Sequence, residues 1–269
     1  MTTDPSTTAD PSTTLTYSSY LALDEILAAQ RPRSAEDDEL LFIVVHQVHE
    51  LWFKELLHEL AKLQRELCGG ESVPALRTLH RCLTVLEVIS AEIDVIETMT
   101  PYQFSGFRAR LGNASGFQSA QFREIEAVLG RRDSGILRVF RSDRERGPIE
   151  AAMKRPSVFD SLLRYLSAKG YPVPRDLLYR DVTEPAEPSE ELRTALLLAR
   201  SDDGFAARVC ERLLALDKAL QDWRYRHIKM VERIIGAKIG TGGSSGASYL
   251  YRTISAPMFP DLWAAWRLP

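Results

Sequence analysis

Residues 223–249, WRYRHIKMVERIIGAKIGTGGSSGASY, decide the fold predicted for this chain. Apolar residues within and before this stretch recur at alternating three- and four-residue steps, which predicts a long helix packed against other helices. His227 lies on the same face, so we expect its side chain to point inward. The face consists of Val209, Leu213, Leu216, Leu220, Trp223, Met230 and Ile234.

An inward histidine has two interpretations. Most often it is a neutral core residue with a local hydrogen bond. Neutral imidazole is also a common axial ligand of haem iron. Cationic residues on the same helix favour a haem ligand, because haem carries carboxylate side arms that need cations near its edge. These residues are Arg224, Arg226, Lys229 and Arg233.

The helix is followed by a glycine-rich loop, GTGGSSG, at residues 240–246. It lacks the Gly-Lys-Ser/Thr ending of a P-loop and the spacing and preceding strand of a dinucleotide fingerprint. We interpret it as backbone able to close over a ligand, with Thr241, Ser244 and Ser245 offering hydroxyl groups. The alternative is a plain flexible linker.

The composition is that of an ordinary globular protein. The 269 residues are 45% hydrophobic and 26% charged with a net charge of −3, which argues against a nucleic-acid partner. No apolar run is long enough to cross a membrane, and the N-terminus shows no secretory signal. Three scattered cysteines, Cys68, Cys82 and Cys210, predict neither a disulfide framework nor a zinc site and suggest the cytoplasm.

The hydrophobic pattern predicts an all-α protein, a helical bundle. We expect a disordered tail over residues 1–14 and a single helical domain over 15–269, with an irregular proline-rich excursion at about 170–188. No internal repeat or long alternating segment is present. Helices are predicted at about 17–30, 34–67, 74–99, 102–111, 118–129, 134–141, 158–169, 189–200 and 204–236.

A second informative block is LLFIVVHQVHELWFKELLHEL, residues 40–60. Phe42, His46, His49 and Phe53 share one face, and a second apolar face adjoins it, so this helix should be central. The block also contains Glu55 and His58 in the Glu-x-x-His spacing of di-iron bundles. No second copy of that unit exists, which makes a di-iron site a weak alternative.

The third block, residues 98–126, places Arg108 beside Phe104 and Phe107. An arginine among aromatic rings can bind a carboxylate through two parallel hydrogen bonds. The alternative is a surface arginine whose stem covers apolar neighbours. Arg123, on the following predicted helix, can serve a second anionic group.

Together with the helix at 17–30, these three blocks resemble the tryptophan 2,3-dioxygenase family in order and almost without gaps. The resemblance covers most of residues 15–130 and 205–265, whereas about 140–200 matches little. It implies an all-α bundle with a haem pocket between long helices, assembled as an intertwined homotetramer. It also implies haem b as cofactor, O2 as co-substrate and L-tryptophan as substrate.

The resemblance assigns a role to individual residues of this sequence. His227 resembles the axial ligand of the iron, and His46 the distal residue that accepts a hydrogen bond from the indole N–H. Arg108 resembles the residue that binds the substrate carboxylate. Phe42, Phe104, Ser115 and Thr241 complete the substrate site, Trp223, Arg123 and Tyr249 lie near the haem carboxylates, and Tyr17, Tyr20 and Leu21 come from a neighbouring subunit.

The implied reaction inserts O2 across the indole C2–C3 bond and yields N-formyl-L-kynurenine. Two alternatives use the same residues: a haem monooxygenase acting on a tryptophan derivative, and a haem protein without turnover. His49 is the unexpected residue, one turn from His46. It is either a packed histidine behind the pocket or a sign of altered distal chemistry or of a modified tryptophan substrate.

Overall fold

A computed structural model describes residues 15–112, 114–235 and 256–267, and over these residues the protein is all-α, as predicted. No strand occurs in these ranges. The helices are α1 (Tyr17–Leu21), α2 (Leu23–Leu27), α3 (Asp38–Cys68), α4 (Ser72–Ile96), α5 (Pro101–Arg108), α6 (Ala120–Leu129), α7 (Asp143–Met153), α8 (Val158–Ala168), α9 (Arg175–Leu178), α10 (Glu190–Ser201), α11 (Phe205–Ile235) and α13 (Pro260–Arg267), with 3-10 turns at Ala109–Leu111, Gly116–Gln118 and Ser134–Val139.

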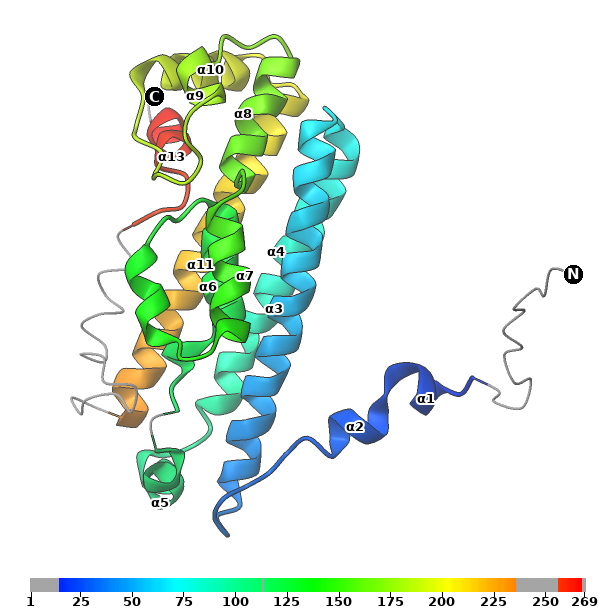
Figure 1. Ribbon diagram of the computed structural model, residues 1–269, viewed down its shortest axis with the longest axis vertical. Coiled ribbons are helices and arrows are strands. Elements are labelled where there is room, and N and C mark those ends of the chain that lie inside the picture. The colour runs from blue at the N-terminus through cyan, green and yellow to red at the C-terminus, as the bar shows by residue number, and fades with distance from the viewer. Residues whose placement is uncertain (1–14, 113, 236–255, 268–269) are drawn as a thin grey trace, which may run out of the picture.

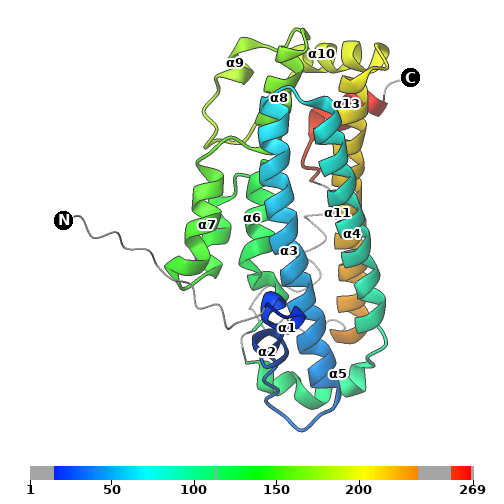
Figure 2. The ribbon, with the colours of Figure 1, turned by 90° about the vertical axis from the view of Figure 1, so that its right-hand side faces the viewer.

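Three long helices, α3, α4 and α11, form the body of the molecule (Figures 1 and 2). α4 packs along both α3 and α11, whereas α3 and α11 make few direct contacts with each other. Leucine and isoleucine side chains on α3 and α4, such as Leu60, Leu63 and Ile89, are completely buried in this core. The space between α3 and α11 is therefore bordered by α4 on one side and by α6 on the other.

The middle of the chain, which the sequence leaves without a motif, packs on the outside of this body. α8 lies along α3, and α7 packs on α6. α7 was not predicted, and it contains Gly147 and Pro148, two residues that disfavour the interior of a helix. The helix tolerates this proline, whose fixed φ is compatible with helical geometry and which removes only one backbone donor.

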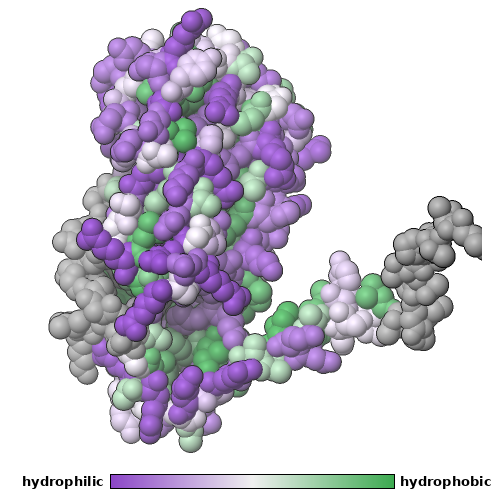
Figure 3. Space-filling view, in the orientation of Figure 1, coloured by the Kyte–Doolittle hydropathy of each residue, from purple (hydrophilic) through white to green (hydrophobic). Residues whose placement is uncertain are grey.

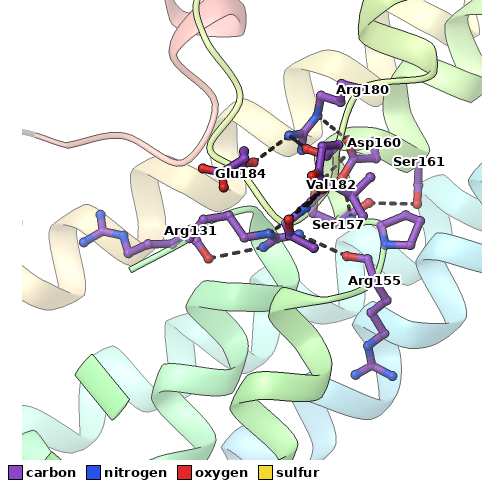
Figure 4. A network of polar contacts seen from close by, with 12 residues as sticks. Arg131, Arg155, Ser157, Asp160, Ser161, Arg180, Val182 and Glu184 are labelled. Carbon is purple, nitrogen blue, oxygen red and sulfur yellow. Dashed lines mark hydrogen bonds and ion pairs between the residues drawn. The ribbon is translucent and has the colours of Figure 1, made fainter. Parts of the chain in front are cut away.

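The proline-rich excursion at about 170–188 is irregular except for α9, and two arginines attach it to the bundle (Figure 4). Arg180 bonds Asp160 at 2.9 Å through Nε and donates to the carbonyl oxygen of Glu184 at 2.7 Å. Arg132 donates to the carbonyls of Val182 and Arg155. Side chains thus replace the regular backbone bonds that this segment lacks.

Several predicted helix boundaries were wrong. The helix expected at 17–30 is two short helices, because Ala22 adopts a left-handed conformation with φ of 50° between them. α3 begins at Asp38 and not at residue 34, since the Ser34 hydroxyl and backbone N–H are bound by buried Glu39. α13 was missed, and the helix expected at 134–141 is a 3-10 turn.

α1 and α2 form an arm that extends away from the body (Figure 1). Gln47 of α3 fixes its base by bonding Gln30 and the carbonyl of Ala29. The arm carries apolar side chains with no cover in the single chain (Figure 3), including Tyr17 at 76% and Tyr20 at 72% exposure. The predicted tail at 1–14 lies outside the described residues. Within the described part of the chain, no helix is both long and apolar enough to span a bilayer.

Candidate active site

A central pocket lies between α3 and α11, which meet there through the rings of His49, Phe53 and Trp223. It contains about 880 Å³ of space between atoms, with open solvent at its mouth included. Its walls come from α3, α4, α6, α11 and the 3-10 turn before α6. The lining residues are Val45, His46, His49, Glu50, Phe53, Ile93, Ile96, Gly116, Phe117, Ser119, Phe122, Arg123, Trp223, Arg224, His227, Ile228 and Met230.

Helical spacing explains why these residues meet. His46, His49 and Phe53 follow one another at three- and four-residue steps along α3, and Trp223, His227 and Met230 do so along α11. Such steps keep side chains on one face of a helix. The two facing stripes therefore place three imidazoles in a single pocket.

His227 projects into the pocket from α11, with its ring stacked on Trp223 at a centroid separation of 5.6 Å and an interplanar angle of 18°. Burial lowers the pKa of His227 to about 4, and the charges of His46, His49 and Arg123 add to this effect. The imidazole is therefore neutral at pH 7 and keeps a lone pair for a metal ion.

His46 projects from α3 into the same pocket. Its Nδ1 lies 2.7 Å from the carbonyl oxygen of Phe42, so Nδ1 carries the hydrogen and Nε2 is left as an acceptor. Burial lowers the pKa of His46, against the opposing effect of the Phe42 carbonyl. This side chain is a neutral acceptor at pH 7.

Aromatic rings surround His46 at the end of the pocket that is covered by α5. The Phe42 ring lies 4.2 Å from His46, 5.8 Å from Phe104 and 5.5 Å from Phe107. A Thr100–Gln103 capping box begins α5, and the helix ends at half-buried Arg108. We call the set Phe42, His46, Phe104, Phe107 and Arg108 the aromatic end of the site.

The opposite end is built around buried charges. Glu126 of α6 forms ion pairs with Arg123 at 2.7 Å and with Arg224 of α11, and Arg131 lies 3.8 Å away. Burial acts to raise the pKa of Glu126, but the charges of Arg123, Arg224 and Arg131 together lower it. Three guanidinium groups thus lie around the Glu126 carboxylate.

His49 lies beside this charged cluster and has a carboxylate partner of its own. Its Nδ1 is 2.9 Å from the Val45 carbonyl and 3.1 Å from Oε2 of Glu92, and Trp52 donates to the other oxygen of Glu92 at 3.1 Å. The His49 ring is 6.4 Å from that of Trp223. We call the set His49, Glu92, Arg123, Glu126, Trp223 and Arg224 the ionic end.

The residues of the pocket fit a haem. Among the described residues, no three His, Cys, Asp or Glu side chains are arranged so that they could together hold a metal ion. One neutral imidazole facing aromatic and aliphatic walls suits an iron that a macrocycle already holds. At the ionic end, Nε1 of Trp223 and Nε of Arg123 are buried with no hydrogen-bond partner among the described residues. Buried donors without partners are costly, and haem carboxylates would satisfy them.

Most of the residues singled out in the sequence converge on this pocket. His46, Arg123, Trp223 and His227 line it. Phe42 and Phe104 lie beside His46, and Arg108 ends the helix that covers them. The hydroxyl of half-buried Ser115 accepts from the N–H of Phe117, next to the lining residue Gly116.

Five other predicted site residues are not placed in the pocket. Tyr17, Tyr20 and Leu21 belong to α1 on the arm, away from the pocket of their own chain (Figure 1). Thr241 and Tyr249 lie outside the described residues, as does the glycine-rich loop at 240–246.

Sequence reasoning missed the acidic residues of the site. Glu92 falls three residues after Ile89 and one before Ile93, on the buried side of α4, which was a detectable signal. Glu126 is three residues after Arg123, a spacing that favours an ion pair on a helix. Glu55 is half-buried and His58 exposed, and the described residues offer no further ligands for the di-iron alternative.

Most of the chain is similar in sequence to known proteins. The family model for tryptophan 2,3-dioxygenase matches residues 3–147 and 203–267. A tryptophan 2,3-dioxygenase of Anaeromyxobacter dehalogenans is 58% identical over 253 residues, covering 91% of this chain and 92% of the relative. Those of Herpetosiphon aurantiacus and Caulobacter vibrioides are 51% and 42% identical, each covering 91% of this chain and 94% of the relative.

Proposed function

The chain belongs to the tryptophan 2,3-dioxygenase family, and on this premise we propose how its residues perform the reaction. The enzyme is a haem-dependent dioxygenase that inserts both atoms of O2 across the indole C2–C3 bond of L-tryptophan and yields N-formyl-L-kynurenine. The observation that carries the assignment of roles is the pocket itself, where His227 of α11 faces His46 of α3.

We propose haem b as the cofactor, with His227 as the axial ligand of the iron. Its low pKa, caused mainly by burial, keeps the nitrogen lone pair free at neutral pH. Trp223, Arg123 and, from outside the described residues, Tyr249 would hold the carboxylate arms. When bound, the haem supplies the iron chemistry that activates dioxygen.

The aromatic end is the proposed seat of L-tryptophan. A zwitterion with a large apolar side chain needs one fixed cation, a few hydroxyls and aromatic walls. Arg108 supplies the cation for the substrate carboxylate, and Phe42 and Phe104 pack against the indole. Ser115 and Thr241 are the proposed hydroxyl partners.

His46 orients the indole in this proposal and leaves its proton in place. The Phe42 carbonyl holds the hydrogen on Nδ1, so Nε2 can accept a hydrogen bond from the indole N–H. The indole N–H is a very weak acid, and burial lowers the basicity of His46 further. The role of His46 is therefore to align C2 and C3 of the ring.

The apolar arm supports a homotetramer in which Tyr17, Tyr20 and Leu21 complete the pocket of a neighbouring subunit. Apolar side chains exposed at the tip of an extended arm are typical of surfaces covered on assembly. Free Cys68, Cys82 and Cys210 agree with a proposed cytoplasmic location.

Product analysis with labelled dioxygen tests the function. The reduced, haem-loaded enzyme is incubated with L-tryptophan and ¹⁸O2, and the product is examined by mass spectrometry. Two labelled oxygen atoms are expected in N-formylkynurenine. A gain of one atom would identify a monooxygenase and contradict the assignment.

A further inference from the structure

His49 is a pocket residue to which the proposed mechanism gives no task. Its Nδ1 bonds the Val45 carbonyl oxygen at 2.9 Å and lies 3.1 Å from Oε2 of Glu92, a buried oxygen with no hydrogen-bond partner among the described residues. The contact with the Val45 carbonyl assigns a ring hydrogen to Nδ1. Nε2 has no hydrogen-bond partner among the described residues, and Trp52 holds Glu92 in place by bonding its other oxygen.

The ring contacts place His49 at the ionic end and not beside the substrate seat. Its centroid is 6.2 Å from Phe53 and 6.4 Å from Trp223, and Trp223 is 4.9 Å from Phe122. The Arg123 guanidinium lies 5.4 Å from the Phe122 ring. His49 thus lies in the same cluster of side chains as Trp223 and Arg123, whose buried donors have no partner among the described residues.

Those donors indicate what occupies this end of the pocket. Nε1 of Trp223 and Nε of Arg123 are both buried and have no hydrogen-bond partner in the part of the chain that the structure describes. Burying a donor without an acceptor costs free energy. A carboxylate offers acceptors to several donors at once. The substrate carboxylate is assigned to Arg108 at the aromatic end, which leaves a carboxylate arm of the haem for the ionic end.

We propose that His49 is a third partner of this haem carboxylate and that it takes up a proton when haem binds. The imidazolium then lies between two carboxylates, donating through Nδ1 to Glu92 and through Nε2 to the haem arm. This inference rests on the proposed haem site and assigns to Glu92 and Trp52 the task of holding His49 in position.

The charges around His49 have opposing effects on the protonation of its ring. Glu92 of α4 and the incoming carboxylate favour the protonated ring, since opposite charges at hydrogen-bond distance stabilise each other. Arg123 and Arg224 oppose it, although Glu126 offsets part of their charge. His46 and Glu50 of α3 and His227 of α11 are the remaining titratable groups that line the pocket.

Haem and its dimethyl ester, which lacks the carboxylates, provide a direct test. The full-length protein is loaded with haemin or with haemin dimethyl ester, and the rate of transfer to apomyoglobin is followed by absorption. The wild type should release haemin at least tenfold more slowly than the ester, as expected for hydrogen bonds to charged groups. His49→Phe should reduce this ratio about tenfold, and Glu92→Gln should reduce it less.

His46→Phe is the matched control, because it replaces a pocket histidine at the aromatic end and should leave the ratio of the two rates unchanged. Proton uptake gives a second readout. Between pH 6 and 9 the loss of haemin from the wild type should accelerate as pH rises, and this dependence should be absent for the ester and for His49→Phe.

Each outcome decides the proposal. Equal ratios in the wild type and His49→Phe, or the same pH dependence in both, overturn the role of His49 while the haem site and N-formylkynurenine formation stand. A protein that takes up neither porphyrin overturns the haem site and this inference together. If His49→Phe does not fold, His49→Gln tests the same ratio with a smaller polar side chain.

Discussion

The two ends of the central pocket differ in how their polar groups are satisfied. At the aromatic end, His46 bonds a backbone carbonyl, and the rings of Phe42, Phe104 and Phe107 pack around it. At the ionic end, Glu126 bonds arginines from two helices, while Trp223 and Arg123 each bury a donor that has no partner among the described residues. The aromatic end thus offers one hydrogen-bond acceptor among aromatic rings, whereas the ionic end offers hydrogen-bond donors.

This difference indicates which ligand binds at each end of the pocket. A flat indole with one weak N–H donor fits rings and a neutral imidazole. Carboxylate arms of a haem fit the buried donors and the arginines of the ionic end. His227 lies between the two ends on the opposite wall, where its lone pair can reach the iron.

The largest effect is expected at the ionic end. Glu126→Ala leaves Arg123 and Arg224 buried without their carboxylate, and it should lower the free energy of unfolding by about 3–5 kcal/mol. Urea unfolding of the haem-free protein measures this. The control is Asp222→Ala, which removes the exposed pair with Lys218 and should cost at most about 1 kcal/mol. Equal effects would mean that the buried cluster is not a structural unit.

The next effect is expected at the aromatic end. Arg108→Ala should weaken L-tryptophan binding by about 2–4 kcal/mol, because the substrate carboxylate loses its charged partner. Spectral titration of the reduced enzyme gives the dissociation constant. Arg110→Ala removes an exposed arginine two residues away and should change it little. Similar losses in both variants would reject the clamp.

Because of His227, the free energy of unfolding should depend on pH. The pKa of His227 falls from 6.5 to about 4 on folding, mainly through burial, so the unfolded chain binds a proton in this range that the folded chain does not. The unfolding free energy of the haem-free protein should therefore decrease as pH falls through this window, by up to about 3 kcal/mol. His227→Phe should show a flatter profile, and identical profiles would contradict a neutral, buried His227.

The smallest effect is expected for the orienting histidine. His46→Ala removes one hydrogen bond to the indole and should lower kcat/KM about tenfold while the haem spectrum persists. His80→Ala, an exposed histidine on α4, is the control. Complete loss of turnover in His46→Ala would show that His46 does more than orient the substrate.

Much of this arrangement was predictable from sequence. The three- and four-residue spacing of α3 and α11 places His46 and His227 on inward faces, because helical geometry alone determines which residues share a face. The partners of Arg224 and His49 were not predictable in the same way. Glu126 bonds Arg224 across 98 positions of sequence, and Glu92 reaches His49 from another helix.

Local signals also failed where tertiary contacts decide the backbone. Ser34 has the character of a helix cap, yet Glu39 binds it and the helix begins four residues later. Gly147 and Pro148 suggest a loop, but packing on α6 keeps them within α7. In both cases long-range packing or a side-chain bond outweighs the intrinsic preference of the residue.

His227 is the proposed ligand of the haem iron, and ligand rescue tests this role most directly. His227→Gly opens a space for free imidazole, and the absorption spectrum of the haem-loaded variant is recorded with and without added imidazole. We predict a spectrum without native ligation that returns to the wild-type form when imidazole is added. A wild-type spectrum in the variant before any imidazole is added would contradict the central claim.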